Sequence, residues 1–433
     1  MTRSSPPRRI LLSEGSSNSA RQTLYGLGRG HVIDILDSSR WCQCQFSRLV
    51  RRRIPAPPIA KDPLGYLRLV ARLVQKHEYD VLFPTHEQVY AFAKFRDQFS
   101  KDVGLAVPDF EILRRVQNKG TFCELMRELG LPIPPTRMVD QVDGLSTSDD
   151  YPLFVKLIHS TASLGVKKVA SAGEGIAVLQ DFARRGVWKP GEAVVLQQPA
   201  PGQQGEVTAV FQEGRMVAAA CADVLATGIG GGPALRRTAI HPPVLADLEK
   251  FGREVGWHGP ISMEYFYDHK QQQPFYIEAN PRIGESLNCL AGGVNLCEAT
   301  VRVSLGEQVP RYPEVRPGIV THNGFIVMIA AAFNGEGRWQ LLQRMWKHWT
   351  SRPRHESEMT RPREDWMSLI PATAVITLLL LSPQSAHQLA YGTVENYSLP
   401  SSAAAVIDQL QEADVFGFGP NSRQLPPGVP SLS

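Results

Sequence analysis

Apolar and polar positions alternate in blocks over the N-terminal part of the chain. Three short apolar runs are strand-like: 9–15, 31–37 and 80–84. Between them, apolar residues recur every three or four positions, as in a helix, at 16–27, 64–77 and from Glu87 onward. Strands that alternate with helices are typical of βαβ units. The pattern therefore predicts an α/β fold with an open parallel sheet over residues 1–108.

The pattern changes after Pro108. Asp109 is placed to cap a helix that ends near Asn118, and a second helix runs from Lys119 to the Gly130 turn. From Tyr151 the chain is rich in strand-like segments separated by polar or Gly-containing turns, which predicts hairpins and an antiparallel sheet. Helices are expected within this part at 173–184 and 243–255, and strands at 154–157, 166–170, 193–198, 206–211, 216–223, 261–267 and 275–279.

A Pro-rich stretch after Gly306 opens a third part, so we expect three domains: 1–108, 109–308 and a mixed C-terminal domain of unknown role, 309–433. Within the last part, 370–381 is strongly apolar and is bracketed by Pro371 and Pro383. A membrane-spanning helix needs about 20 residues, so this segment is predicted to be a buried core element. An interfacial helix stays open as an alternative, because Arg and Lys lie nearby, as do Trp339, Trp346, Trp349 and Trp366.

The composition is that of an ordinary globular protein. The chain has 433 residues, 43% hydrophobic and 20% charged, with a formal net charge of +4. So small a charge gives little reason to expect nucleic acid as a partner, and membrane association is not expected either. The six cysteines are scattered without zinc-type spacing, which favours free thiols in a reducing compartment. With no apolar signal segment near Met1, we expect a cytoplasmic protein.

The segment 276–282 (YIEANPR) carries the sharpest chemical signal. Residues two apart on a strand face the same side, so Glu278 and Asn280 can present oxygens to one cation. Glu264 precedes Glu278 by 14 positions (278 − 264), which suits the opposite position on an antiparallel neighbour. Two carboxylates and an amide oxygen suit one or two Mg²⁺ ions, with Mn²⁺ as an alternative. Arg282 adds a fork suited to phosphate or an acyl phosphate.

The pattern of these residues resembles the metal- and phosphate-binding motif of the ATP-grasp superfamily. The segment Glu278-Ala-Asn-Pro-Arg282 is similar to the motif of its carbamoyl phosphate synthetase-like, carboxylate–amine ligase branch. The resemblance covers about Asn118 to Glu298. It implies a pre-ATP-grasp domain followed by a two-lobed fold that grips ATP. It also implies an ADP-forming ligase, which activates a carboxylate as an acyl phosphate and joins it to an amine. A homodimer is common in that family.

The resemblance extends to the expected nucleotide contacts. Asn118-Lys119 is similar to the family's first phosphate-contacting lysine, and Lys156 to the second, although Leu157 replaces the usual proline. The small-residue loop 160–166 lies where the family has its phosphate-covering flap, and the strand 194–200 resembles its adenine hinge. The resemblance therefore implies these nucleotide-binding residues: Lys119, Lys156, Ser163, Gly165, Gln197, Gln198, Ala200 and, for the ribose, Glu206.

The acceptor side is less specific. The Gly cluster after Leu225 leads to Arg236 and Arg237, one of which the resemblance implies steadies the transferred phosphoryl group together with Arg282. Neighbouring strand residues face opposite ways, so the sequence does not say which arginine faces inward. Glu285 and Ser286 are candidates for the acceptor pocket, with helix capping as the alternative. The histidines, among them His86, His159 and His241, show no catalytic spacing and are expected to be structural.

Two other functions stay open. The acid could be bicarbonate or carbamate, as in carboxylases and carbamoyl phosphate synthesis, although no biotin-carrier sequence or second ATP-grasp copy is evident. The chain could also bind ATP without hydrolysing it, because Leu157, the amides Gln197 and Gln198 and the glycine-poor flap depart from the family's pattern. The identities of the acid and the amine are not encoded in any readable motif.

Overall fold

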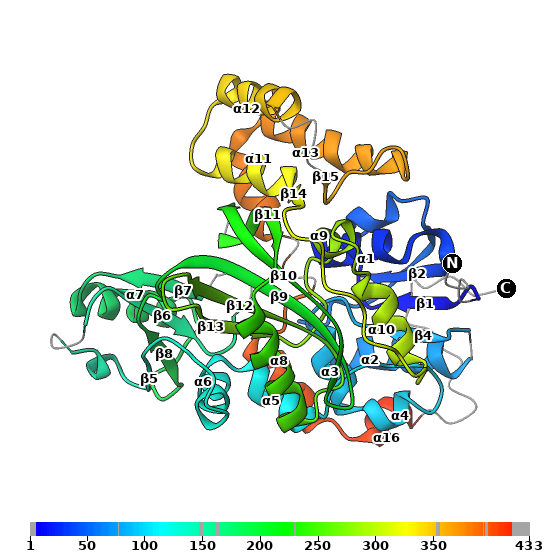
Figure 1. Cartoon of the computed structure of the whole chain (residues 1–433), viewed down its shortest axis with the longest axis horizontal. Helices are drawn as coiled ribbons and strands as arrows, with labels where there is room; N and C mark the ends of the chain where they lie inside the picture. Colours follow the sequence, from blue (N-terminus) through cyan, green and yellow to red (C-terminus); the bar gives the residue numbers. More distant parts are fainter. Residues whose placement is uncertain are drawn as a thin grey trace.

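The computed structural model describes residues 6–76, 78–146, 150–160, 165–228, 231–351, 356–392, 394 and 397–417. Figure 1 shows an N-terminal α/β part, a central curved sheet, a small antiparallel lobe beside it and a group of C-terminal helices above. The predicted α/β class is confirmed. Ser163 lies outside the described residues, so its predicted role in the flap stays a prediction.

The N-terminal sheet is parallel and has the order β3-β2-β1-β4. Its inner strands are almost wholly buried, because helices pack on both faces of such a sheet. The polar residues that follow β1 and β4 therefore lie together at the carboxyl edge, where open α/β sheets bind ligands. The elements of this part are β1 (Arg9–Leu12), α1 (Asn18–Leu27), β2 (Val32–Asp37), β3 (Val50–Pro55), α2 (Pro63–Gln75), β4 (Val81–Phe83), α3 (Gln88–Lys94) and α4 (Arg96–Phe99).

The central sheet has seven strands in the order β13-β12-β9-β10-β11-β14-β15. The predicted hairpins are confirmed: β9 pairs with β10, and β12 with β13, both antiparallel. The β9–β10 turn is polar and contains a glycine, as predicted for these turns, and both Glu213 and Gly214 have positive φ angles there. The strands are β9 (Gln203–Gln212), β10 (Arg215–Thr227), β11 (Pro233–Ala239), β12 (Gly259–Asp268), β13 (Gln273–Asn280), β14 (Val320–His322) and β15 (Glu356–Ser357).

A second, smaller antiparallel sheet has the order β5-β8-β6-β7 and is covered by one helix. Leu153, Val155 and Leu196 pack against Leu179 and Phe182 in its core. The lobe therefore has a core separate from that of the central sheet, and the two sheets form the two lobes that the resemblance implied. Its elements are β5 (Thr136–Val139), β6 (Leu153–Leu157), β7 (Val166–Val169), α7 (Ala172–Arg184) and β8 (Val194–Gln197).

Five helices connect or cover the two lobes. Asp109 caps the first of them through Glu111 N, as the sequence predicted, and Asn118 caps the second through Gly120 N and Thr121 N. The second cap fixes where Lys119 begins its helix. The five helices are α5 (Phe110–Gln117), α6 (Lys119–Glu128), α8 (Pro242–Val255), α9 (Leu287–Ala291) and α10 (Leu296–Ser304).

Segments after residue 309 join several parts of the molecule. Strands β14 and β15 extend the central sheet, whereas the last two helices pack in the N-terminal core, where Ala403, Ile407 and Val415 meet Leu67. The four helices that lie in the sequence between β14 and the last two helices share a small core of their own. The domain boundaries stay predictions. The helices are α11 (Gly324–Phe333), α12 (Arg338–Ser351), α13 (Leu369–Leu381), α14 (Ala386–Tyr391), α15 (Ser401–Gln409) and α16 (Glu412–Phe416).

The prediction that 370–381 forms a buried core element is wrong. The segment forms most of helix α13, but only Leu379 is fully buried, and Leu369, Ile370, Leu378 and Leu381 are exposed. Hydrophobicity indicates that a segment avoids water, but it does not identify the surface that covers it. Among the described residues, no helix has both the length and the apolar character needed to cross a membrane.

A buried ion pair anchors the loop after β15 to the N-terminal part. Arg21 on α1 and Asp365 are almost inaccessible to solvent, and Arg21 Nη2 lies 3.2 Å from Asp365 Oδ2. Asp365 also accepts a hydrogen bond from the backbone N–H of Arg48. Because each charge is desolvated, each depends on the other for compensation.

Asp365→Ala is expected to destabilise the protein by about 3–5 kcal/mol, because it leaves the Arg21 guanidinium buried without its counter-ion. Asp97→Ala is the control, since its ion pair with Arg96 is largely exposed and its loss costs at most about 1 kcal/mol. Urea unfolding followed by fluorescence measures both changes. Equal effects of the two substitutions would contradict the assignment.

Candidate active site

Three carboxylates form a row across the central sheet. Glu206 on β9 is paired with Glu264 on β12, and Glu264 with Glu278 on β13. The predicted register of Glu264 and Glu278 is therefore confirmed. Directly opposed residues of an antiparallel sheet project from the same face. The three carboxylates consequently line one side of the space between the lobes.

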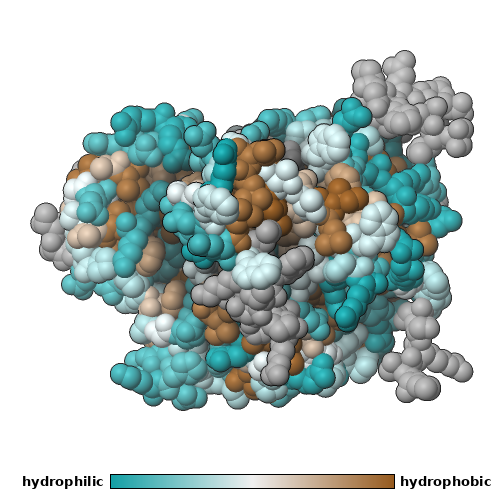
Figure 2. Space-filling model, turned by 90° about the horizontal axis from the view of Figure 1, so that it is seen from above, coloured by the Kyte–Doolittle hydropathy of each residue, from teal (hydrophilic) through white to brown (hydrophobic). Residues whose placement is uncertain are grey.

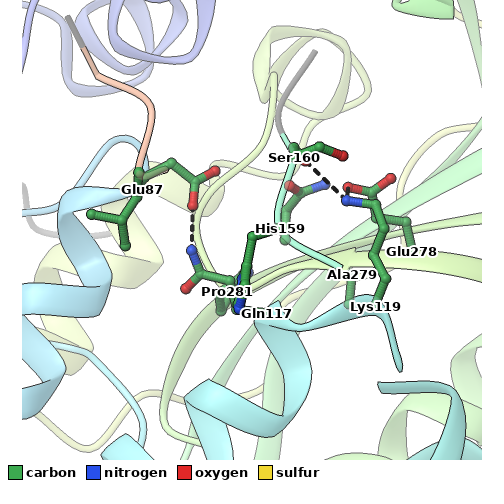
Figure 3. Close-up of a pocket in the computed structure, with 10 residues that line it drawn as sticks. Glu87, Gln117, Lys119, His159, Ser160, Glu278, Ala279 and Pro281 are labelled. Carbon is green, nitrogen blue, oxygen red and sulfur yellow. Dashed lines mark hydrogen bonds and ion pairs between the residues drawn. The ribbon is translucent and has the colours of Figure 1, made fainter. Parts of the chain in front are cut away.

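Two lysines from the smaller lobe and its preceding helix reach this row. Lys119 Nζ lies 3.1 Å from Glu278 Oε1 and donates to the backbone oxygen of Ser160. Figure 3 shows both interactions from the start of α6. Lys156 Nζ donates to Gln197 Oε1 at 2.6 Å and to Ile277 O at 3.4 Å. Both predicted phosphate-binding lysines thus lie beside the predicted metal carboxylates.

Burial disfavours the charged forms of the ionisable groups in this site, and repulsion between the carboxylates adds to that effect. The pKa of the Glu264 carboxyl is raised to about 7, first by burial and then by Glu278 and Glu206. Burial is also the main cause of the lowered pKa of Lys156, against the opposing effect of Glu278. Nearby cations would restore the charged form of Glu264.

Arg282 lies at the boundary between the central sheet and the N-terminal part. Its Nη2 donates to Asn280 Oδ1 at 3.1 Å and to Glu87 Oε1 at 3.3 Å. Asn280 and Glu87 therefore hold the guanidinium in place. Its Nε is buried and has no hydrogen-bond partner among the described residues, and the same is true of Gln117 Oε1 and Ser160 Oγ. Gln117 and Ser160 line the same cavity, and unpaired buried polar atoms at a cavity indicate a place for a polar ligand.

A small cavity lies among these groups, between the two lobes and the N-terminal part. Figure 3 shows Glu87 and Gln117 on one side of it and Lys119 with Glu278 on the other. His159, Ser160, Asn280, Ala279, Pro281 and Leu399 complete its walls. Most of the lining side chains are thus polar, and Ala279, Pro281 and Leu399 are the apolar ones.

The predicted hinge residues have different surroundings. Gln197 is buried, and its amide nitrogen donates to Thr136 Oγ1 at 3.0 Å while its oxygen accepts from Lys156. Gln198 extends toward Asp150, and Ala200 lies in the connection between β8 and β9. The adenine contacts of these residues stay predictions, and so does the ribose contact of Glu206.

Gly165, in the predicted flap, is packed tightly against β6. A Cβ atom there would lie 2.6 Å from the Ser160 Cβ and 2.9 Å from the Leu157 Cδ1. Its carbonyl accepts a hydrogen bond from the Leu157 N–H at 2.8 Å. Gly165 therefore fixes the end of the loop, and its contact with phosphate stays a prediction.

The two neighbouring arginines of β11 face opposite sides of the sheet. Arg236 is buried and its three nitrogens each bind a different carboxylate: Glu206 at 2.5 Å, Glu358 at 2.5 Å and Glu285 at 2.7 Å. Arg237 instead pairs with Asp223, which also binds His241. Arg236 is thus the arginine on the face of the carboxylate row. With all three nitrogens bound, it organises the acidic groups around it.

The acceptor-side candidates contact three parts of the chain. Glu285 accepts hydrogen bonds from Asn18 and Gln22 of α1. Ser286 makes no capping hydrogen bond but lies 3.3 Å from the Cys297 sulfur. Gln22 also donates to the fully buried Glu358, which follows β15. Side chains from three separate segments therefore meet around Arg236: α1, the residues after β13 and the segment after β15.

Four residues of this region carried no prediction of a functional role: Glu87, Gln117, Glu358 and Leu399. A signal for Glu87 does exist, because it follows the carboxyl end of a buried parallel strand. Glu358 and Leu399 arrive from distant segments and leave no local pattern. His86, predicted to be structural, has its pKa well below the usual value because it is buried and close to Arg282, and it packs against the Tyr397 ring.

No protein-family profile matches the chain. Among curated proteins it is similar to the large chain of carbamoyl phosphate synthase from Pyrococcus furiosus, with 23% identity over 220 residues. This match covers 47% of the chain but only 20% of the relative. The chain thus spans about a fifth of that protein's length.

Several solved structures are similar to this chain over a larger share of its length. N5-carboxyaminoimidazole synthetase from Staphylococcus aureus, complexed with ADP, superposes with a TM-score of 0.60 at 15% identity, over 80% of this chain and 87% of that one. The biotin carboxylase domain of 2-oxoglutarate carboxylase from Hydrogenobacter thermophilus, with MgADP and bicarbonate, gives 0.59 at 15%, over 73% and 74%. L-amino acid ligase from Bacillus licheniformis gives 0.54 at 15%, over 70% and 75%. The chain has the ATP-grasp fold.

The donor set of this ATP-grasp site fits a hard divalent cation. Glu264 and Glu278 supply carboxylate oxygens from opposed strand positions, and Asn280 supplies an amide oxygen. The described residues contain no group of three or more His, Cys, Asp or Glu that could by itself hold a metal ion. Magnesium requires no such group, because it is usually held by one or two carboxylates, water and substrate phosphates.

Lys156→Ala is expected to weaken MgADP binding about 10- to 100-fold, because a buried charge-assisted phosphate contact would be lost. Lys167→Ala, on the exposed face of β7 in the same lobe, is the matched control and should bind normally. Calorimetric titration measures both affinities, and thermal unfolding in parallel shows whether each variant folds. Normal MgADP binding by a folded Lys156→Ala protein would refute the assignment.

Proposed function

We propose that this chain is an ATP-dependent ligase that phosphorylates a carboxylate and joins it to an amine. The observation that supports this proposal most directly is the meeting of Lys119 and Glu278 at one cavity, with Glu264 opposite Glu278 on the neighbouring strand. Phosphate-binding cations and a cation-binding carboxylate pair are the two requirements for phosphoryl transfer from ATP. The ATP-grasp fold and its ADP-bound neighbours agree with that chemistry.

In this proposal, each group of residues would bind a different part of the substrates. Lys119 and Lys156 hold nucleotide phosphates, and Glu264, Glu278 and Asn280 hold magnesium. The metal would supply charge neutralisation as negative charge develops on the transferred phosphoryl group. Arg282, held in place by Glu87 and Asn280, binds the acid through the nitrogen that has no partner among the described residues.

In the first step, a carboxylate oxygen of the acid attacks the γ-phosphorus, and the bond to the β-phosphate oxygen breaks to release ADP. In the second, the amine nitrogen attacks the acyl carbon and inorganic phosphate leaves, while the nitrogen loses a proton to solvent or to a nearby carboxylate. Both steps conserve charge and need no oxidant. The desolvated site keeps water from the acyl phosphate.

The surroundings of Arg236 support an amine as the acceptor. Glu206, Glu285 and Glu358 offer three carboxylates to one guanidinium. Burial and the neighbouring carboxylates raise the pKa of the Glu206 carboxyl to about 7, despite the opposing effect of Arg236. A cationic ammonium group approaching this region would be attracted, and a nearby carboxylate can accept the proton that it must lose.

Bicarbonate is the second candidate for the acid. The cavity next to Arg282 is small, and two structural neighbours are a biotin carboxylase with bicarbonate and N5-carboxyaminoimidazole synthetase. Carbamoyl phosphate synthase is the curated relative. ADP release that depends on bicarbonate and needs no amine would favour this alternative over an organic acid.

Small molecules are the proposed partners, an acid and an amine, without nucleic acid. A homodimer also stays a prediction; the biotin carboxylase neighbour was solved as a domain dimer.

Glu278→Ala combined with Asn280→Ala is expected to lower substrate-dependent ADP release at least about 100-fold, because two of the proposed metal ligands are lost. Glu254→Ala, exposed on α8, is the control and should retain full activity. A coupled ADP-release assay over libraries of acids and amines, with bicarbonate as a separate arm, identifies the substrate pair first.

Undiminished turnover in the double variant would show that the metal site is wrongly assigned. ATP binding without ADP release across the whole panel would instead support a non-catalytic nucleotide-binding protein.

A further inference from the structure

Two helices of the C-terminal group are unusually apolar for their exposure. Helix α11 (GFIVMIAAAF) and helix α13 (LIPATAVITLLLL) contain no charged residue. Leu381 at the end of α13 is 70% exposed, and Leu369, Ile370, Leu378 and Phe333 are also exposed. A helix that is hydrophobic on all sides normally lies in a core or in a membrane. Here much of that surface faces outward.

The helix between them, α12, has a different composition. The sequence from 338 to 354 carries five basic residues and no acidic one, and one of the five, Arg344, is paired with Glu336 just before this stretch. Trp339 on α12 is 79% exposed, and Trp346 on the same helix and Trp366 before α13 are exposed as well. Tryptophan and arginine together are typical of segments at a membrane–water interface, where the ring and the cation both reach the headgroup region.

The basic and apolar features lie next to each other. Helices α11, α12 and α13 pack on one another, and Arg338 Nη2 donates to Leu381 O at 2.8 Å. The first basic residue of α12 is thus beside the most exposed leucine of α13. Figure 1 places these helices at one end of the molecule, and Figure 2, seen from that side, shows hydrophobic residues exposed between hydrophilic ones.

The geometry excludes a spanning role for α13. A helix of 13 residues is about 20 Å long at 1.5 Å per residue, whereas the hydrocarbon layer is about 30 Å thick. The remaining arrangement in lipid is parallel to the surface, with the apolar side in the acyl boundary and the cations at the phosphate level.

We propose that α11, α12 and α13 form a docking surface for an anionic phospholipid membrane. Exposed leucines of α13 enter the acyl boundary, Trp339 lies at the headgroup level, and Arg338 attracts the lipid phosphates. The docking is reversible and interfacial. It extends the proposed function, because it locates the ligase at a membrane surface.

A second copy of the chain is the main rival occupant, and the charge pattern favours lipid over it. A symmetric dimer would place identical surfaces against each other, so the stretch 338–344, where Arg338 and Arg344 are exposed, would meet its own copy. Anionic headgroups supply the opposite sign, and each basic residue near such a surface contributes about 1 kcal/mol. The exposed tryptophans next to this stretch have the amphipathic character that the interface favours.

The test is flotation of the full-length protein with vesicles of phosphatidylcholine and phosphatidylglycerol, and with vesicles of phosphatidylcholine alone. We expect flotation with the mixed vesicles and at least about tenfold weaker association with the neutral ones, because the anionic lipid supplies the counter-charge. Raised salt should weaken the association with the mixed vesicles.

Two variants test the surface. Leu378→Glu with Leu381→Glu should lower association with the mixed vesicles at least about tenfold, because apolar burial is lost at two sites. Trp339→Ala should lower it by a smaller factor. Trp41→Ala is the matched control: Trp41 is also 79% exposed but lies in the N-terminal part, so it should float like the unchanged protein. Thermal unfolding, measured on each variant, reports whether the protein still folds.

Failure of the full chain to float with the mixed vesicles would overturn the proposal, as would flotation that the leucine variant leaves unchanged. A concentration-dependent dimer that the leucine variant abolishes, without vesicle association, would assign the surface to a second copy. None of these readouts depends on turnover, so they leave the proposed ligase activity to be judged by its own assay.

Discussion

One buried guanidinium is the point on which the arrangement of this molecule depends. Arg236 binds Glu206 of the central sheet, Glu285 after β13 and Glu358 after β15, and Gln22 of α1 bonds to the last two. Three desolvated carboxylates are tolerated only because a cation lies among them. The parts of the chain are therefore held together by charge compensation at the acceptor side of the proposed site.

The local half of the site could be predicted from the sequence. Glu264 and Glu278 belong to one hairpin, so strand periodicity and a short turn are enough to fix their register. Lys119 follows a recognisable cap. Glu358 and Leu399 reach the same region through long connections, and no periodicity in the sequence encodes where such connections lead. The nearer the contacting residues are along the chain, the more of the site the sequence predicts.

The C-terminal helices show a different limit. The hydrophobic pattern of α13 correctly indicated an element that avoids water, but the burial predicted for it is found only at Leu379. Transfer from water is favourable whichever apolar surface replaces it. The pattern therefore cannot distinguish a protein core from a lipid surface, whereas the exposed Trp339 and Arg338 are the features on which our proposal of a lipid surface depends.

The packing of helices α15 and α16 affects the order in which the parts of the protein fold. Helices α15 and α16 pack into the core of the parallel sheet formed by the beginning of the chain, where Ile407 and Val415 are fully buried. On the way there, Tyr397 packs against His86, and Leu399 closes one wall of the cavity. Domains generally fold as they leave the ribosome. Here the core around the parallel sheet is completed only after residues 401–416 have been synthesised, and Leu399 reaches the cavity wall equally late.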